Sequence, residues 1–250
     1  MVAAEVSEHE VFTDVAQYLQ DLVLGSPEVE GFLGDLAVYS AARLSDPGRT
    51  VSCGISVFRK KKTTTTASSS PCARLMDQLQ HQYDDGPCLT VMRDTVPVLV
   101  PDLRLEKRWP AYVQAAKGLG ILSVVGVPLP LEKPSQAVLN LYSEQPHAFS
   151  GQAIARAETF AGQASKGLQL ALRLGQLQET RDDMKAAMKS RTVIDLATGA
   201  IMAKNRCSQN TAFKVLLHVS NTQNIKLNEV AARVVSDISG TGTATTYFDE

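Results

Sequence analysis

The apolar residues between positions 10 and 45 recur every three or four residues, which is the spacing of amphipathic helices. Gly25-Ser-Pro27 interrupts this pattern, so two helices are expected. The next run, Val51–Phe58, alternates apolar and polar residues as a β-strand does. Lys60–Lys62 and four threonines follow. Threonine is β-branched, and we therefore expect a hairpin with polar flanks rather than a phosphate-binding or localisation signal.

The middle of the chain alternates between the two kinds of element. A short amphipathic helix is expected over residues 73 to 83, closed by the turn-forming residues Asp84–Pro87. The elements expected next are a strand at Val96–Val100, a helix around Tyr112–Lys117, strands at Ile121–Leu129 and Ala137–Tyr142, and a hairpin loop at Pro130–Gln136. A further helix begins near Gly151. This order predicts an α+β domain with a mainly antiparallel sheet.

A connecting helix follows, with apolar residues at heptad spacing: Leu170, Leu174, Leu177, Met184 and Met188. Arg181 and Arg191 occupy further positions of the same seam. The seam could pack on the preceding domain, remain an amphipathic linker in a monomer, or pair with a second copy as a parallel coiled coil. We expect the third arrangement, a homodimer.

The last part of the chain has the pattern of a three-helix bundle. Ser208 is a plausible N-cap for its second helix, and the helical pattern places Phe213 of that helix in the core. Gly240 ends the third helix, and a disordered tail is expected over 240–250. The apolar positions of the three helices are Val193, Ile194, Ala197, Ile201, Ala212, Leu216, Leu217, Val219, Leu227, Val230, Ala231, Val234, Val235 and Ile238.

Composition limits the class of protein. A chain of 250 residues with 44% hydrophobic and 20% charged residues has room for one full-size domain and a smaller module. No apolar run approaches the ~18 residues of a membrane span, and the N-terminus lacks the features of a secretory signal. We therefore expect a cytoplasmic protein with no membrane association. The four cysteines form no C-x-x-C pair, so no zinc ribbon is expected.

The charge is unevenly distributed. The formal net charge is −1, but residues 181 to 240 carry nine basic and five acidic residues, a surplus of four. The C-terminal part is thus the one that a polyanion would approach. No nucleotide-binding, nucleophile-elbow or metalloprotease motif occurs, and the four histidines are scattered. Neither enzymatic activity nor a cofactor or metal site is expected.

Several motifs in order resemble the GAF sensor domains of actinobacterial regulators. They are Asp85-Gly-Pro-Cys88, Pro97-Val-Leu-Val-Pro-Asp102-Leu-Arg, Arg108-Trp-Pro, Ser123-Val-Val-Gly-Val-Pro128-Leu and Ala137-Val-Leu-Asn140-Leu-Tyr-Ser143. The resemblance covers residues 12–172 and implies the GAF-like fold. It leaves the ligand open, since GAF domains bind many different small molecules or none. A ligand would be expected in a pocket lined by one face of the sheet.

The final helices resemble the ANTAR domain, the RNA-binding module of bacterial transcription antitermination regulators. Ala197, Gly199 and Met202 fall on the A-x-G-x-x-M pattern of that family, preceded by Arg191 and Ile194-Asp195. Thr198 stands where many members have lysine. The resemblance implies binding to paired hairpins with small loops in nascent transcripts. Two hairpins need two ANTAR domains, which agrees with the expected dimer.

The expected RNA-binding residues are small or basic, because loop bases are splayed and reachable while phosphates attract cations. Ala197 and Gly199 would allow close approach, although tight helix packing would select the same residue sizes. Base stacking on aromatic residues is not expected, because Phe213 is assigned to the core. The complete set of expected RNA-binding residues is Arg191, Ala197, Thr198, Gly199, Met202, Lys204, Arg206 and Lys214.

These observations predict an antitermination regulator that binds RNA under the control of its sensor domain. The alternatives are a ligand-sensing adaptor whose C-terminal bundle binds a protein partner and, less favoured because no basic recognition helix is evident, a DNA-binding regulator. The expected organisation is an N-terminal tail (1–11), a GAF-like sensor domain (12–172), a connecting helix (173–190), an ANTAR bundle (191–239) and a tail (240–250).

Overall fold

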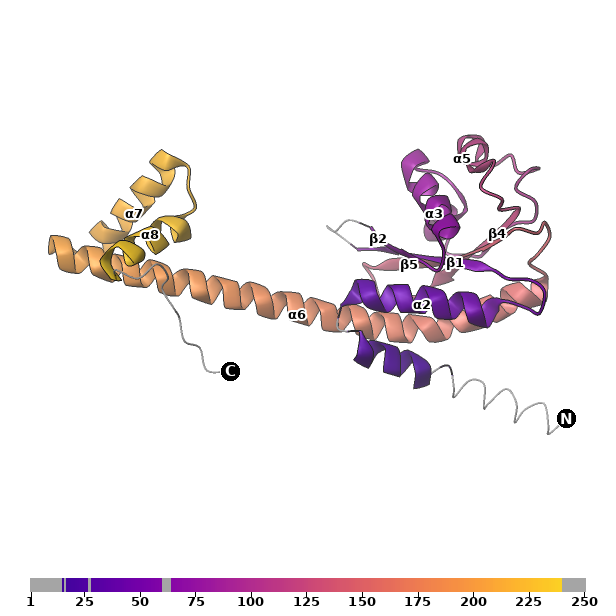
Figure 1. Cartoon of the computed structure of the whole chain (residues 1–250), viewed down its shortest axis with the longest axis horizontal. Coiled ribbons are helices and arrows are strands. Elements are labelled where there is room, and N and C mark those ends of the chain that lie inside the picture. Colours follow the sequence, from indigo (N-terminus) through magenta and orange to yellow (C-terminus); the bar gives the residue numbers. More distant parts are fainter. Residues whose placement is uncertain (1–14, 16, 27, 60–63, 240–250) are drawn as a thin grey trace. The chain divides into compact units, whose positions relative to one another are not determined.

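The computed structural model of the chain describes residues 15, 17–26, 28–59 and 64–239. They form two compact units, one reaching to Gly175 and the other starting at Gln176 (Figure 1). The two terminal tails and the lysines 60–62 expected from the sequence lie outside the described residues. Each unit is described by itself below.

The first unit is built on a five-stranded antiparallel sheet. Its strands are β1 (Ser52–Phe58), β2 (Thr65–Ser68), β3 (Val98–Val100), β4 (Ser123–Leu129) and β5 (Gln136–Ser143). The order across the sheet is β2-β1-β5-β4-β3. The central pairs have long registers, with Val125 opposite Leu141 and Ile55 opposite Leu139. The expected α+β fold with an antiparallel sheet is confirmed, including the hairpins between β1 and β2 and between β4 and β5.

Helices cover both faces of this sheet. A helical segment over residues 17–25, α2 (Val29–Leu44) and the first part of α6 (Gly151–Asn205) pack on one face, where Phe32, Leu36 and Leu168 are fully buried. The other face carries α3 (Pro71–Tyr83), α4 (Pro87–Asp94) and α5 (Pro110–Ala116). Figure 1 shows α2 and α6 on one side of the sheet and α3 and α5 on the other.

Each of the helices α3, α4 and α5 has a proline in its first turn. Proline suits this position because its missing N–H has no helical partner there in any case. The sequence pattern did not predict α4, because it assigns no element between the turn at Asp84–Pro87 and the strand at Val96–Val100. A helix this short has too few turns to show periodicity, and its stability comes from burying Cys88 and Val91 against the sheet.

The edge of the sheet at β4 is only partly covered. β3 pairs with β4 over Val124–Gly126, and the described part of the chain places no strand beside Val127–Leu129 on that side. Pro128 stands in this uncovered stretch, and Pro130 follows the end of the strand. Neither proline has an N–H to offer an approaching strand, so the edge lacks donors at these positions.

The second unit contains the end of α6, α7 (Gln209–Gln223) and α8 (Leu227–Ser239). Ser208 is confirmed as the N-cap of α7, since its side chain accepts a hydrogen bond from the Thr211 N–H. Asn224 ends α7 in the left-handed conformation. A small core joins the three helices through Ala197, Leu216 and Ala231. The helix α6 continues without a break through residue 190, where the sequence analysis placed a boundary.

Candidate functional site

The residues expected to bind RNA lie on the end of α6, on the α6–α7 connection and on α7. Arg191, Gly199, Lys204, Arg206 and Lys214 are exposed, and Met202 is half-buried against the small core. Arg206 ends α6 with a φ of 49°, in the left-handed region. Five of the eight expected residues therefore lie on the surface of this unit.

Ala197 and Thr198 are buried, and the structure corrects their assignment to the RNA contact set. Ala197 is completely inaccessible in the core of the three helices. The Thr198 hydroxyl donates a hydrogen bond of 2.7 Å to the Ile194 carbonyl oxygen one turn earlier. Tight packing thus explains Ala197. It does not explain Gly199, where an added Cβ would meet no atom within 4 Å.

Three of the exposed cations form no ion pair with an acidic side chain in the described part of the chain: Lys204, Arg206 and Lys214. Arg191 differs from them, because its Nε lies 3.8 Å from Asp195 Oδ2 one turn away. This ion pair is long and solvent-exposed, so it contributes little to stability. It nevertheless offsets part of the positive charge of Arg191.

Phe213 is exposed, which contradicts its expected place in the core. Its side chain retains 38% of its accessible surface, and Leu217, one turn further along α7, is also exposed. The buried stripe of α7 follows Ala212, Leu216 and Ser220 instead. Phe213 borders that stripe, which explains the wrong assignment. An aromatic surface for stacking a base is therefore available.

The first unit contains a buried polar cluster between the sheet and the helices α3 and α4. Asp77 Oδ1 accepts hydrogen bonds from the Tyr142 hydroxyl at 2.5 Å and from Asn140 Nδ2 at 3.0 Å. Gln80 Nε2 donates to the Tyr142 hydroxyl at 3.1 Å, and Gln80 Oε1 accepts from the Cys88 N–H at 2.6 Å. The cluster thus ties α3 to β5 and to the start of α4.

Burial controls the ionisation of this cluster. It raises the pKa of the Asp77 carboxyl to about 7, although hydrogen bonds from Tyr142, Asn140 and Ser68 favour the charged form. It also raises the pKa of the Cys88 thiol to about 12, assisted by the nearby Asp77 carboxyl. Cys88 is therefore a neutral thiol at physiological pH and not an activated nucleophile.

This cluster was not predicted from the sequence, although the sequence contains two signals of it. Asp77 and Gln80 lie on the buried stripe of α3 with Ala73 and Met76. Asn140 interrupts the apolar run of β5. A carboxylate or amide at a position whose periodicity points into a core is a polar group that needs buried partners.

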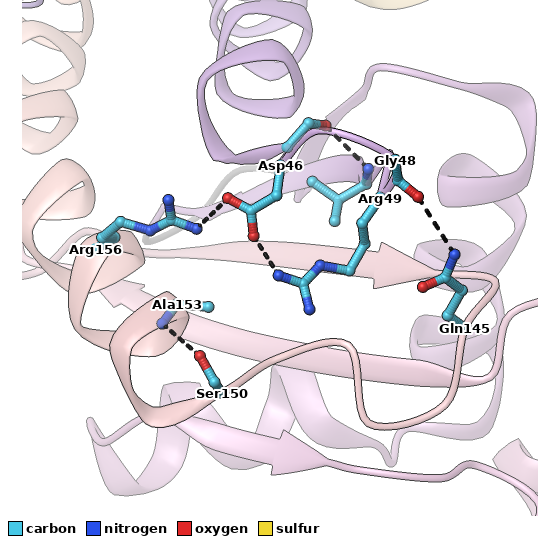
Figure 2. Close-up of polar contacts among 9 residues, drawn as sticks. Asp46, Gly48, Arg49, Gln145, Ser150, Ala153 and Arg156 are labelled. Carbon is cyan, nitrogen blue, oxygen red and sulfur yellow. Dashed lines mark hydrogen bonds and ion pairs between the residues drawn. The ribbon is translucent and has the colours of Figure 1, made fainter.

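Two further features of the first unit are not part of this cluster. A groove of about 440 Å³ runs along the uncovered end of β4 and is lined by α4, the β4–β5 loop and α6. At the loop after α2, Asp46 accepts from Arg49 and, at 2.7 Å, from Arg156 Nη2 (Figure 2). These two arginines lower the pKa of the Asp46 carboxyl, and the ion pairs anchor the loop to the start of α6.

The described residues contain no group of three His, Cys, Asp or Glu side chains that could hold a metal ion. Among the helices that the structure describes, none is long and apolar enough to cross a membrane.

The fold is similar to that of several solved structures. One is the GAF domain of an Acinetobacter phosphoenolpyruvate-protein phosphotransferase, with 18% identity over 66% of this chain and 98% of that chain and a TM-score of 0.46. Another is CepR2, an N-acylhomoserine lactone-dependent LuxR family transcription factor from Burkholderia cenocepacia, with 14% identity over 67% and 99% of the two chains and a TM-score of 0.49. At such low identity the likeness concerns the fold alone.

Family models match both units. Residues 182–235 match the ANTAR domain, and residues 5–169 match the GAF domain. No curated protein sequence matches the chain. GAF domains are sensor domains and ANTAR domains are RNA-binding antiterminators, so both are regulatory rather than catalytic families. The GAF match spans well over half of the chain, which therefore belongs to the GAF domain family and carries an ANTAR domain after it.

Proposed function

We propose that this protein is a transcription antitermination regulator that binds paired hairpins in nascent mRNA and is regulated through its GAF unit. The observation that carries the proposal is the cationic surface of the ANTAR bundle, on which Lys204, Arg206 and Lys214 are exposed. Nascent mRNA as the target implies that the protein acts in the cytoplasm. The GAF unit would respond to a signal and not catalyse a reaction.

The exposed residues suit a hairpin loop better than a duplex. The major groove of A-form RNA is too deep and narrow for side chains, whereas loop bases are accessible. The three cations can contact phosphates on either side of a loop. Gly199 leaves open space on the surface of α6, and Phe213 on α7 offers an aromatic face to an unstacked base.

Binding of labelled RNA with two hairpins, compared with duplex DNA of equal length, tests this function. We expect RNA to bind at least about 100-fold more tightly, with a log–log salt slope of about −0.7 to −0.9 for each neutralised phosphate. Equal affinity for the two polyanions would contradict RNA recognition. Binding to neither would favour an adaptor whose bundle contacts a protein.

A second copy of the chain is the proposed partner of the α6 seam. Leu170, Leu174, Leu177, Met184 and Met188 are all exposed, and Leu177 retains 66% of its accessible surface. With Arg181 counted between Leu177 and Met184, the positions alternate in steps of four and three residues, as the core positions of a coiled coil do. Pairing would cover these side chains and would present two ANTAR bundles to two hairpins, so that the second contact becomes intramolecular.

Replacing Leu177 and Met184 with glutamate is expected to convert the dimer to monomers. The two paired α6 helices would otherwise bury negative charges against each other at the seam. Sedimentation equilibrium measures the change. Affinity for two-hairpin RNA should fall by about 100-fold, while affinity for a single hairpin stays the same. Gln176→Glu with Ala186→Glu adds the same charge at exposed positions off the seam and should leave the dimer intact. A monomeric wild-type protein would contradict the proposed partner.

A further inference from the structure

The Asp77 carboxyl is buried without a countercharge. Only 2% of the residue is accessible to solvent. Its hydrogen-bond donors, Tyr142, Asn140 and the Ser68 hydroxyl at 3.4 Å, are all neutral groups. No cation contributes to the pKa of this carboxyl. A buried carboxylate in this position gains hydrogen bonds but no ion pair, so the neutral acid competes with it.

The groups that face Asp77 come from every element packed around it. They are Gln80 on α3, Gly54 and Ser56 on β1, Ser68 on β2, Cys88 on α4, Tyr112 on α5, and Asn140 and Tyr142 on β5. The titratable members are Cys88, Tyr112 and Tyr142, and burial raises the pKa of each of them, so all three are uncharged near neutral pH. His81 lies one turn from Asp77 on α3, and partial burial lowers the pKa of its imidazole.

The surroundings also contain acceptors that lack a donor. Asn140 Oδ1 and Ser56 Oγ are buried and have no hydrogen-bond partner; the Cys88 thiol lies near both but makes no hydrogen bond of normal geometry with either. The hydroxyl of Tyr112 is unpaired as well. A protonated Asp77 gains one O–H donor. Rotating the Asn140 side-chain amide by about 180° would exchange the positions of its oxygen and its NH₂ group. The oxygen could then accept a hydrogen bond from protonated Asp77, and the NH₂ group would occupy the place where Oδ1 now has no partner.

We propose that Asp77 is the proton-binding site through which the GAF unit responds to pH. Proton binding neutralises the charge beneath α3 and supplies the missing donor, whereas proton release leaves an unpaired negative charge between α3 and the sheet. The proposal names the signal for the sensor role given above and rests on that role, but it concerns the GAF unit alone.

The direction of the effect follows from linkage. The pKa of Asp77 in the folded protein is raised to about 7 from the ordinary 3.8. The contribution of protonated Asp77 to the free energy of unfolding is fully present below pH 3.8 and is lost as pH rises through about 7. The reason is that the unfolded chain releases this proton at a lower pH than the folded protein does. The loss between pH 5 and 7.5 corresponds to an increase on the order of 100-fold in the unfolding equilibrium constant.

Carbon NMR of the aspartate carboxyl groups in the full chain reads the site directly. We expect one resonance, absent from Asp77→Asn, to titrate with a midpoint near pH 7. Above this pH the exchange protection of the α3 amides, corrected for the intrinsic base-catalysed rate, should fall in wild type and not in Asp77→Asn. A midpoint below pH 5 would overturn the proposal. Neither measurement uses RNA, so a failure here leaves the antitermination function standing, and absence of RNA binding leaves the proton site standing.

Two variants separate Asp77 from the other carboxyl groups. Asp77→Asn should remove the difference in unfolding between pH 5 and 7.5 that this site causes. Asp46→Asn removes a partly buried carboxyl in another part of the GAF unit, whose pKa is lowered by Arg156 and Arg49, and it should leave the Asp77 midpoint unchanged. If Asp77→Asn does not fold, Tyr142→Phe provides the test, since loss of this donor should move the midpoint upward. Equal pH dependence in wild type and Asp77→Asn, or a Tyr142→Phe midpoint that does not rise, would overturn the proposal.

Discussion

Simultaneous replacement of Lys204, Arg206 and Lys214 with alanine is expected to weaken binding to two-hairpin RNA by about 100-fold at ~0.15 M salt. All three side chains are exposed on the ANTAR unit, and no ion pair is found for them within the described ranges. Each lost phosphate contact should also reduce the salt slope by about 1. Filter binding at several salt concentrations gives both quantities. The thermal transition should barely change, because exposed substitutions usually alter stability by no more than ~0.5 kcal/mol each.

The matched control removes three exposed lysines of the GAF unit, Lys107, Lys117 and Lys166. It changes the net charge of the protein by the same amount, so a general effect of charge would weaken both variants equally. We expect the control to bind RNA like the wild type. Equal losses in the two variants would mean that the cationic surface of the ANTAR unit is not the binding site.

Gly54→Ala is expected to destabilise the GAF unit by roughly 3 kcal/mol, combining overpacking with the loss of buried hydrogen bonds. A Cβ at this position would lie 1.9 Å from Asp77 Oδ2 and 2.7 Å from Asp77 Cγ. The carboxyl cannot move aside without breaking its contacts with Tyr142 and Asn140. Urea denaturation measures the change, and the midpoint of thermal unfolding should fall by roughly 6–12 °C.

Gly34→Ala is the control for this substitution. Gly34 lies within α2, and an added Cβ there would meet no atom within 4 Å. Alanine should therefore stabilise the helix slightly, by up to about 1 kcal/mol. A Gly54→Ala protein as stable as the wild type would show that the polar cluster adapts freely, and the close packing of Asp77 against β1 would then have no energetic importance.

Most elements of the fold could be predicted from the sequence because each has a local cause. The alternation over β1 and the β-type runs over β4 and β5 correspond to strands buried in the sheet, and Ser208 supplies the side-chain acceptor that begins α7. The motif pattern also gave the GAF and ANTAR families, which the family models confirm. A local sequence pattern is sufficient to predict an element when its residue types favour the secondary structure that they adopt in the fold.

The errors fall where burial depends on neighbours from other elements. Ala197 matched a family motif and Thr198 lies within it, but the motif does not distinguish a residue that packs from one that contacts a ligand; here both are buried. The helical pattern placed Phe213 in the core. In the structure the buried face of α7 is centred on Ala212 and Leu216, so Phe213 lies at its exposed border. The partners of Asp77 are 63 and 65 residues distant in sequence, so only the fold brings them together.

The prolines at the end of β4 affect how copies of this protein can meet. Two chains joined through α6 would hold their sheets at a high local concentration, a condition that favours edge-to-edge fusion of strands and aggregation. Pro128 and Pro130 withhold the backbone donors that such a fusion would need along the part of the β4 edge that β3 does not cover. In the proposed dimer, contact at this edge would therefore be disfavoured relative to contact between helix side chains, which can be reversible, whereas backbone pairing tends to propagate.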